Sequence, residues 1–174
     1  MSYFAVALAR LEGGWTGEEL DLAEVEDVEQ LAEVLRDLTG EGAGPALMLL
    51  EEDDEHLAIV RVDGGISSLD EARVFLSDRR AVLASEVAQM LWEDTEPQSE
   101  DEDEDDEDDE DDEDEGTRPL AEPVGDTAIV ADLGTPGAAL VELCAEEGLL
   151  PADVLTAVCE RAGCVDVLES LREG

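Results

Sequence analysis

The sequence predicts an α+β N-terminal domain over residues 1–92, with the element order β-α-β-β-β-α and a mainly antiparallel sheet. It further predicts a disordered acidic linker over residues 93–118 and a small all-α module over residues 119–174. Three observations lead to this division. Short apolar runs with alternating faces fill the first part, a long run of charge interrupts the chain, and helical periodicity follows it.

The first two elements follow from apolar periodicity. Residues 3–11, YFAVALARL, alternate larger and smaller apolar side chains, so we expect a strand with one tightly packed face. Residues 27–38 place apolar side chains at spacings of three and four, which predicts an amphipathic helix. Asp27 is a candidate N-cap, and Gly40 follows the end of the helix.

The next elements are three strands and a helix. Residues 46–51 and 56–62 flank an acidic connection and are expected to form a hairpin, with the second of the two strands in the centre of the sheet. Residues 72–76 are expected to add one more strand. Residues 79–92 predict one helix, and the sheet then has its helices on one face. The apolar side of that helix is expected to carry Val82, Leu83, Val87, Met90 and Leu91.

Order is expected to return near Asp126, which is a candidate cap for a short helix that closes at Gly134; a strand over residues 127–132 is the alternative. Thr135-Pro136 predicts a cap followed by proline at the first helical position of the next helix. Another helix is expected from Pro151 to the residue before Gly163. A last helical turn or two follows through Val165, Leu168 and Leu171.

Acidic residues dominate the whole chain. The sequence has 51 acidic and 9 basic residues and a formal net charge of -42. Phosphate backbones and anionic membranes repel such a chain, so we expect no direct binding to nucleic acid and no association with membranes. A basic protein is the natural partner.

The run over residues 100–115 consists of carboxylates alone. It lacks the glycine and the alternating ligand positions of a calcium loop. It could imitate a polyanion and occupy a basic surface of a partner, or serve as a solvated tether, which we favour. As candidate partner-binding residues, its members are Glu100, Asp101, Glu102, Asp103, Glu104, Asp105, Asp106, Glu107, Asp108, Asp109, Glu110, Asp111, Asp112, Glu113, Asp114 and Glu115.

Four further side chains are candidates for partner binding. Trp15 and Trp92 lie near segment edges, where a large aromatic side chain could anchor an interface or pack at the margin of the domain. Arg79 and Arg80 precede a predicted helix, where positive charge opposes the helix dipole. They could bind an anionic group of a partner, although pairing with the chain's own carboxylates is the favoured interpretation.

Catalytic and metal-binding patterns are weak. His56 is the only histidine, and no nucleophile motif accompanies it, so we expect a structural or surface role. Cys144, Cys159 and Cys164 have the spacings C-x14-C and C-x4-C, which fit reduced thiols in a helical core better than zinc. We therefore expect no metal and no cofactor. With no signal peptide and no membrane-spanning run in the sequence, we predict a cytoplasmic protein.

Several segments together resemble a known family. They are SYFAVALARLEGGW, ALMLLEEDDEHLAIVRVDGG, ARVFLSDRRAVLASEVAQMLWED and GDTAIVADLGTPGAALVELCAEEGLLPADVLTAVCERAG. In layout they resemble the tRNA adenosine deaminase-associated proteins of actinobacteria, and the resemblance implies an association with a tRNA adenosine deaminase. The chain lacks the H-x-E and P-C-x-x-C segments of zinc deaminases, since Leu57 and Ala58 follow His56.

Taken together, these features predict a non-catalytic accessory protein that acts through protein-protein interaction with a basic tRNA-modifying partner, a tRNA adenosine deaminase. The alternative is a general acidic interaction protein, or a chaperone-like protein for basic clients. An enzyme that uses His56, or Arg79 and Arg80, is a third hypothesis.

Overall fold

The computed structural model describes residues 3–40, 44–63, 72–93, 123–146 and 148–174. The acidic run over residues 100–115 and most of the predicted linker lie outside these residues. Six strands form one antiparallel sheet in the order β2-β1-β3-β4-β5-β6. Their bounds are β1 Tyr3–Leu11, β2 Gly14–Glu19, β3 Pro45–Glu52, β4 His56–Asp63, β5 Arg73–Leu76 and β6 Val124–Gly125. The predicted α+β class, the antiparallel sheet and the β3-β4 hairpin are confirmed.

The sequence analysis missed two strands. β2 has the polar, glycine-containing sequence GWTGEE, which shows no clear alternation. It forms a strand because it folds back on β1 after the turn at Gly13, with Leu11 opposite Gly14 and Val6 opposite Glu19. β6 has only two residues and pairs with Phe75 and Leu76 of β5. β2 is thus the second strand of a tight hairpin, whereas β6 depends on pairing with a segment almost 50 positions away.

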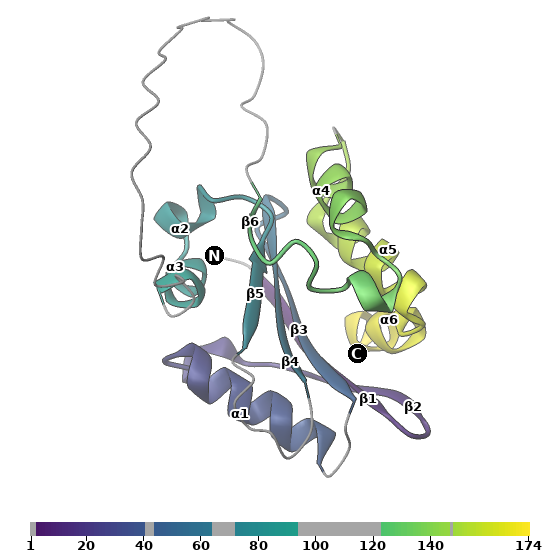
Figure 1. The fold of residues 1–174 in the computed structure, drawn as a ribbon. Coiled ribbons are helices and arrows are strands. Elements are labelled where there is room, and N and C mark those ends of the chain that lie inside the picture. Colours follow the sequence, from purple (N-terminus) through teal and green to yellow (C-terminus); the bar gives the residue numbers. More distant parts are fainter. Residues whose placement is uncertain (1–2, 41–43, 64–71, 94–122, 147) are drawn as a thin grey trace, which may run out of the picture.

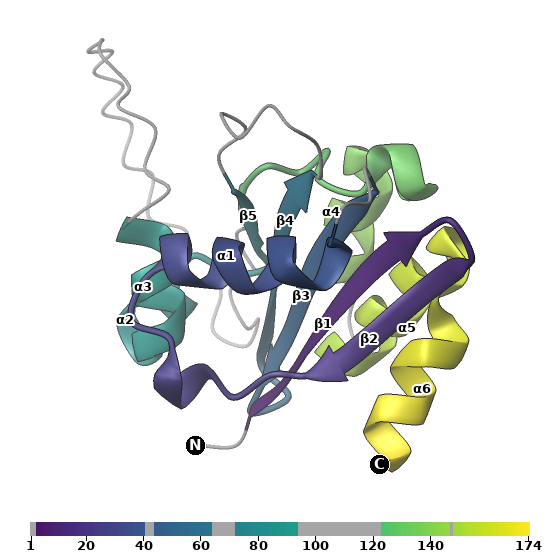
Figure 2. The same cartoon turned by 90° about the horizontal axis from the view of Figure 1, so that it is seen from below.

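The first face of the sheet is the one covered by α1, Val28–Thr39, as Figure 2 shows. The predicted N-cap is confirmed, because the Asp27 carboxylate accepts a hydrogen bond of 2.7 Å from the backbone N–H of Gln30. A short 3-10 helix, η1, spans Leu22–Glu24 before it. The buried stripe of α1 includes Leu31 and Leu35 and packs on the alanines and Met48 of the first face.

The prediction of a single helix over residues 79–92 is wrong. The chain forms α2, Ala81–Ala84, and α3, Glu86–Glu93, with extended backbone at Ser85 between them. The Ser85 hydroxyl accepts a hydrogen bond from the backbone N–H of Ala88 and so caps the start of α3. The break turns Leu83 into solvent, where it is 91% exposed, whereas Leu91 stays in the first-face core.

The second face of the sheet is covered by α4, Gly137–Ala145, α5, Pro151–Ala162, and α6, Val165–Glu173 (Figure 1). The helices of residues 1–92 share one face, as predicted, because α1, α2 and α3 all contribute to the first-face core. The C-terminal helices, which the sequence predicts as a separate module, cover the opposite face of the same sheet. The alternation in β1 explains how the sheet serves two cores, because Ala5 and Ala7 face α1 while Val6 and Leu8 face the C-terminal helices. The prediction of an all-α segment over residues 119–174 is wrong for β6.

Two local predictions in the C-terminal part also need correction. Asp126 begins a turn and not a helix, and the 3-10 helix η2, Ala131–Leu133, follows it. Pro136 is itself the N-cap of α4, and the buried Thr135 hydroxyl has no hydrogen-bond partner, so Thr135 does not cap the helix. The predicted start of α5 at Pro151 is confirmed. No helix in the described ranges combines the length and apolar character that a membrane span requires.

Candidate functional site

The four candidate partner-binding residues outside the acidic run do not form one site. Trp15 is half-buried on β2 and packs against the second-face core, where its indole N–H donates to the backbone carbonyl of Ala162 at 3.2 Å. Trp92 is half-buried against the first-face core. The two tryptophans thus lie on opposite faces of the sheet, and each contributes to packing.

Arg79 and Arg80 are exposed in the turn before α2. The Arg80 guanidinium donates to both carboxylate oxygens of Asp78, with Nε 3.0 Å from each. The expected pairing with the chain's own carboxylates is therefore present at Arg80. An exposed pair of this kind contributes little to stability. The partner-binding roles of the four residues remain predictions.

The only histidine belongs to a buried polar group. The His56 Nε2 atom lies 3.2 Å from Oε2 of Glu52, and the Ser85 hydroxyl donates to the same oxygen at 2.6 Å. All three side chains are buried. Because serine and histidine both contact the carboxylate and not each other, the order differs from that of a nucleophilic triad, in which histidine lies between the other two. The group instead attaches the start of α3 to the hairpin between β3 and β4.

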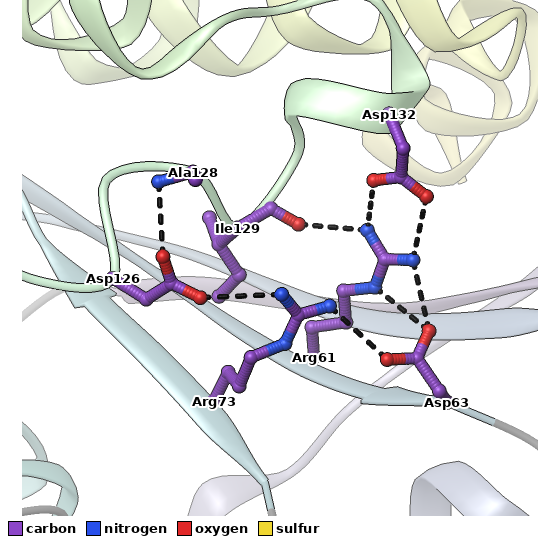
Figure 3. Close-up of polar contacts among 7 residues, drawn as sticks. All are labelled: Arg61, Asp63, Arg73, Asp126, Ala128, Ile129 and Asp132. Atoms are coloured by element: carbon purple, nitrogen blue, oxygen red, sulfur yellow. Dashed lines mark hydrogen bonds and ion pairs between the residues drawn. The ribbon is translucent and has the colours of Figure 1, made fainter.

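A second polar group joins the C-terminal segment to the sheet, and Figure 3 shows it. Arg61 on β4 is buried on the second face and donates to the backbone carbonyl of Ile129 at 2.8 Å and to the carboxylates of Asp63 and Asp132. Arg73 on β5 bridges Asp63 and Asp126 at 3.1 and 3.2 Å. We call these five charged residues the Arg61 cluster.

Electrostatics within the Arg61 cluster favour its charged form. The hydrogen bond from Arg61 holds the pKa of Asp132 below its usual range. The same hydrogen bond to Asp132 raises the pKa of Arg61, even though burial of the guanidinium acts in the opposite direction. Both carboxylates turned toward Arg61 therefore compensate a charge that would otherwise be costly to bury.

Arg172 near the end of α6 forms a third polar link. Its guanidinium donates to the Glu51 carboxylate at 2.7 Å and to the Thr156 hydroxyl at 2.9 Å, and it lies 5.5 Å from the centre of the Phe4 ring. Burial raises the pKa of Glu51, and the nearby Arg172 offsets only part of this rise. Arg172 thus holds α6 against α5 and the sheet.

The cysteines have different surroundings. Burial alone raises the pKa of Cys144 to about 12. The interaction between the thiols of Cys159 and Cys164 raises the pKa of Cys159 and lowers that of Cys164. All three are free thiols. In the ranges that the structure describes, no three His, Cys, Asp or Glu side chains are placed to hold a metal ion.

Exposed carboxylates continue from the edge strand β2 through η1 to α1, with no basic residue between residues 18 and 35. We call this the α1-side acidic surface. A pocket of about 450 Å³ adjoins it, lined by Tyr3, Ala5, Glu19, Leu20 and Asp21. The exposed carboxylates of this surface belong to Glu18, Glu19, Asp21, Glu24, Glu26, Glu29 and Glu33.

The Arg61 cluster was not predicted from the sequence. One signal was present, since Arg61 interrupts the apolar run HLAIVRV of a strand expected in the centre of the sheet. An arginine at such a position needs a carboxylate partner. Its partner Asp132 follows 71 positions later, and no sequence spacing indicates that distance.

Comparison with known proteins identifies a family and a relative in a mycobacterium. The model of a family described as Rv3753c-like tRNA adenosine deaminase-associated protein matches residues 3–165. Protein Rv3753c of Mycobacterium tuberculosis (strain ATCC 25618 / H37Rv) is 27% identical over 168 residues, which cover 97% of this chain and 86% of that protein. No solved structure matches the chain.

Proposed function

Because this chain belongs to the family of Rv3753c-like tRNA adenosine deaminase-associated proteins, we propose that it is a non-catalytic accessory of a tRNA adenosine deaminase. In this proposal it binds the enzyme directly. Its acidic surface contacts a basic surface with which the enzyme holds tRNA, because opposite charges attract and steer the two proteins together. The family description supports the association, and the binding itself is the step to be tested.

The observation that carries the proposal is that arginines of this chain form ion pairs with its own carboxylates. Four arginines form such pairs. They are Arg61 on β4, Arg73 on β5, Arg80 in the turn before α2 and Arg172 on α6. The stretch of the α1-side acidic surface over residues 18–35 contains no basic residue of its own. A basic partner would therefore meet a stretch of exposed carboxylates there, whereas tRNA itself is repelled.

The polar groups of the structure also support a role without catalysis. His56 and Ser85 are buried and share one carboxylate oxygen of Glu52. Arg61 is held by two aspartates and a backbone carbonyl. These side chains already have structural partners, so their arrangement favours attachment of helices to the sheet over contact with a substrate.

A titration of the cognate deaminase with the full chain tests the proposal. We expect saturable binding at low ionic strength that weakens as salt is added, because salt screens attraction between exposed charges. Absence of binding at every salt concentration would overturn the physical association and leave the proteins linked only through their family description.

A pair of charge variants locates the contact. The test variant removes three charges from η1 and α1 through Glu24→Gln, Glu29→Gln and Glu33→Gln. The matched control removes three exposed charges from α4, α5 and α6 through Glu142→Gln, Glu160→Gln and Glu169→Gln. We expect the test variant to bind more weakly and with a smaller salt dependence, while the control binds almost as well as the wild type. Equal losses would show that only total charge matters.

The acidic run over residues 100–115 is tested by replacing its carboxylates with Gln and Ser at unchanged length. A replacement is preferable to a deletion, because the segments on both sides of residues 94–122 contribute to one sheet. If the run is a tether, binding should decrease only modestly. Loss of binding, together with equal wild-type affinity for an unrelated basic protein, would favour the general acidic interaction protein.

A further inference from the structure

Cys159 and Cys164 lie on the two sides of the corner between α5 and α6. The backbone N–H groups of Gly163 and Cys164 both donate to the Cys159 carbonyl at 2.9 Å. Gly163 has a φ of 85°, in the left-handed region. The bond from Cys164 is the six-to-one hydrogen bond of a Schellman motif, in which the side chains at these two positions commonly come into contact. The fold therefore places two thiols in contact at a helix end.

Both thiols are inside the second-face core, with Cys159 0% and Cys164 1% exposed. The two thiols are close enough to influence each other, since their interaction raises the pKa of Cys159 and lowers that of Cys164. Cys144 is also in this core and is half-buried, and burial alone raises its pKa. Packing alone would be served by any small apolar side chain at these positions, whereas a contact between two thiols also permits a covalent bond.

We propose that Cys159 and Cys164 form a redox-active pair that closes reversibly to an intramolecular disulfide when a hydroperoxide oxidises the protein. The Schellman motif supports this chemistry, because a disulfide needs its two α-carbons within a few ångströms and their side chains turned toward each other. Four intervening residues across a helix end allow this arrangement, whereas the same separation within a continuous helix would place the two side chains on different sides of the helix.

The reaction has two steps. Cys164 is the attacking thiolate, because it lies at the N-terminal end of α6, where the helix dipole favours negative charge, and because the neighbouring Cys159 lowers its pKa. Its sulfur forms a bond to one oxygen of the hydroperoxide while the O–O bond breaks, which produces a sulfenic acid on Cys164. The leaving alkoxide, or hydroxide in the case of hydrogen peroxide, takes up the proton that Cys164 released when the thiolate formed. The Cys159 sulfur then attacks that sulfur, the S–O bond breaks, and the hydroxide leaves as water with the proton of Cys159. Two thiols are oxidised by two electrons and one hydroperoxide is reduced.

Docking of α6 controls the reaction, because both sulfur atoms are covered in the structure. An oxidant reaches them only when α6 moves away from α5 and the sheet. Arg172 opposes this motion through its contacts with Glu51 and Thr156. The disulfide would then join the end of α5 to the start of α6, and a thiol reductant would open it again.

Peptide mapping of the full chain tests the pair directly. The protein is treated with hydrogen peroxide, remaining thiols are alkylated, and the chain is digested with trypsin without reduction. Trypsin cleaves after Arg161, between the two cysteines, so only a disulfide keeps the peptide that begins at Ala162 attached. Since Cys144 and Cys159 share one tryptic peptide, the Cys144→Ser variant is the matched control.

We expect the linked peptides in the wild type and in Cys144→Ser, and their separation after reduction. Two results would overturn the proposal. The first is that Cys159 and Cys164 remain reduced, and are therefore alkylated, after a treatment that oxidises Cys144 in the same protein. The second is loss of the link in folded Cys144→Ser, which would assign it to Cys144.

The control by α6 has a test of its own. In Arg172→Gln, the disulfide should form about three to ten times faster, because weaker docking of α6 exposes the thiols more often. Circular dichroism at the same temperature verifies that the variant is folded. An unchanged or slower rate would show that motion of α6 does not limit the reaction.

Discussion

Arg61 on β4 holds Asp132 in η2 through a two-pronged ion pair, although 71 positions separate the two residues in the chain. The same guanidinium also donates to the carbonyl of Ile129. Since Ile129 is fully buried in the second-face core, this contact positions the entry of the C-terminal segment onto the sheet. The polar pair and the apolar core thus act on the same segment.

Removal of Arg61 should weaken this attachment. In Arg61→Met we expect a loss of about 2–3 kcal/mol in the free energy of unfolding, because the Ile129 carbonyl and two aspartates lose a buried charged donor. Denaturation in urea measures the loss. The control is Arg73→Met, which should cost less than about 1 kcal/mol because that side chain is 40% exposed. Equal losses of unfolding free energy in the two variants would show that the buried Arg61 contributes no more than the exposed Arg73.

The pH dependence of stability should reveal Asp132. Its pKa in the folded protein is below the ordinary value of 3.8, so its contribution to the free energy of unfolding is present above pH 3.8. That contribution is lost as the pH falls through the lower folded-state pKa. We expect the stability difference between wild type and Asp132→Asn to be constant near neutral pH and to shrink below pH 3.8. In the Arg61→Met background the difference should be small throughout, and a large one would show that Arg61 is not the cause.

The close approach of α6 to β2 should not tolerate a larger residue at Gly17. An added Cβ would lie 2.9 Å from the backbone oxygen of Ala7 and 2.9 Å from a methyl group of Val167. We expect Gly17→Ala to lower the free energy of unfolding by about 1–3 kcal/mol through overpacking. Gly13→Ala is the matched control, because nothing lies within 4 Å of its added Cβ. The thermal unfolding temperatures of the two variants measure the difference. Equal stability of the two variants would contradict a close contact at Gly17.

The break between α2 and α3 separates two leucines that the sequence placed on one face. Leu83→Ser should change stability by less than about 0.5 kcal/mol, because its side chain is 91% exposed. Leu91→Ala should cost about 2–5 kcal/mol, because Leu91 is fully buried. Chemical denaturation of both variants measures the contrast. A large cost at Leu83 would restore the continuous helix that the sequence predicted.

Sequence periodicity was sufficient to predict the elements that depend on residues close together in the chain. The cap at Asp27 and the alternation of β1 are examples, since each depends on residues within a few positions of one another. For the candidate site, the sequence also supplied the uneven charge and the segments that resemble the family. Those features come from composition and order, which require no contact between distant residues.

Tertiary structure decided the rest. β2 became a strand only through β1, and Ser85 divided a predicted helix because its hydroxyl reaches both Ala88 and Glu52. The apolar stripe of a strand shows that one face is buried without showing which segment covers it. The partnership of Arg61 with Asp132 has the same origin, because contacts between distant residues depend on how the sheet and helices pack, and no spacing along the chain records that packing.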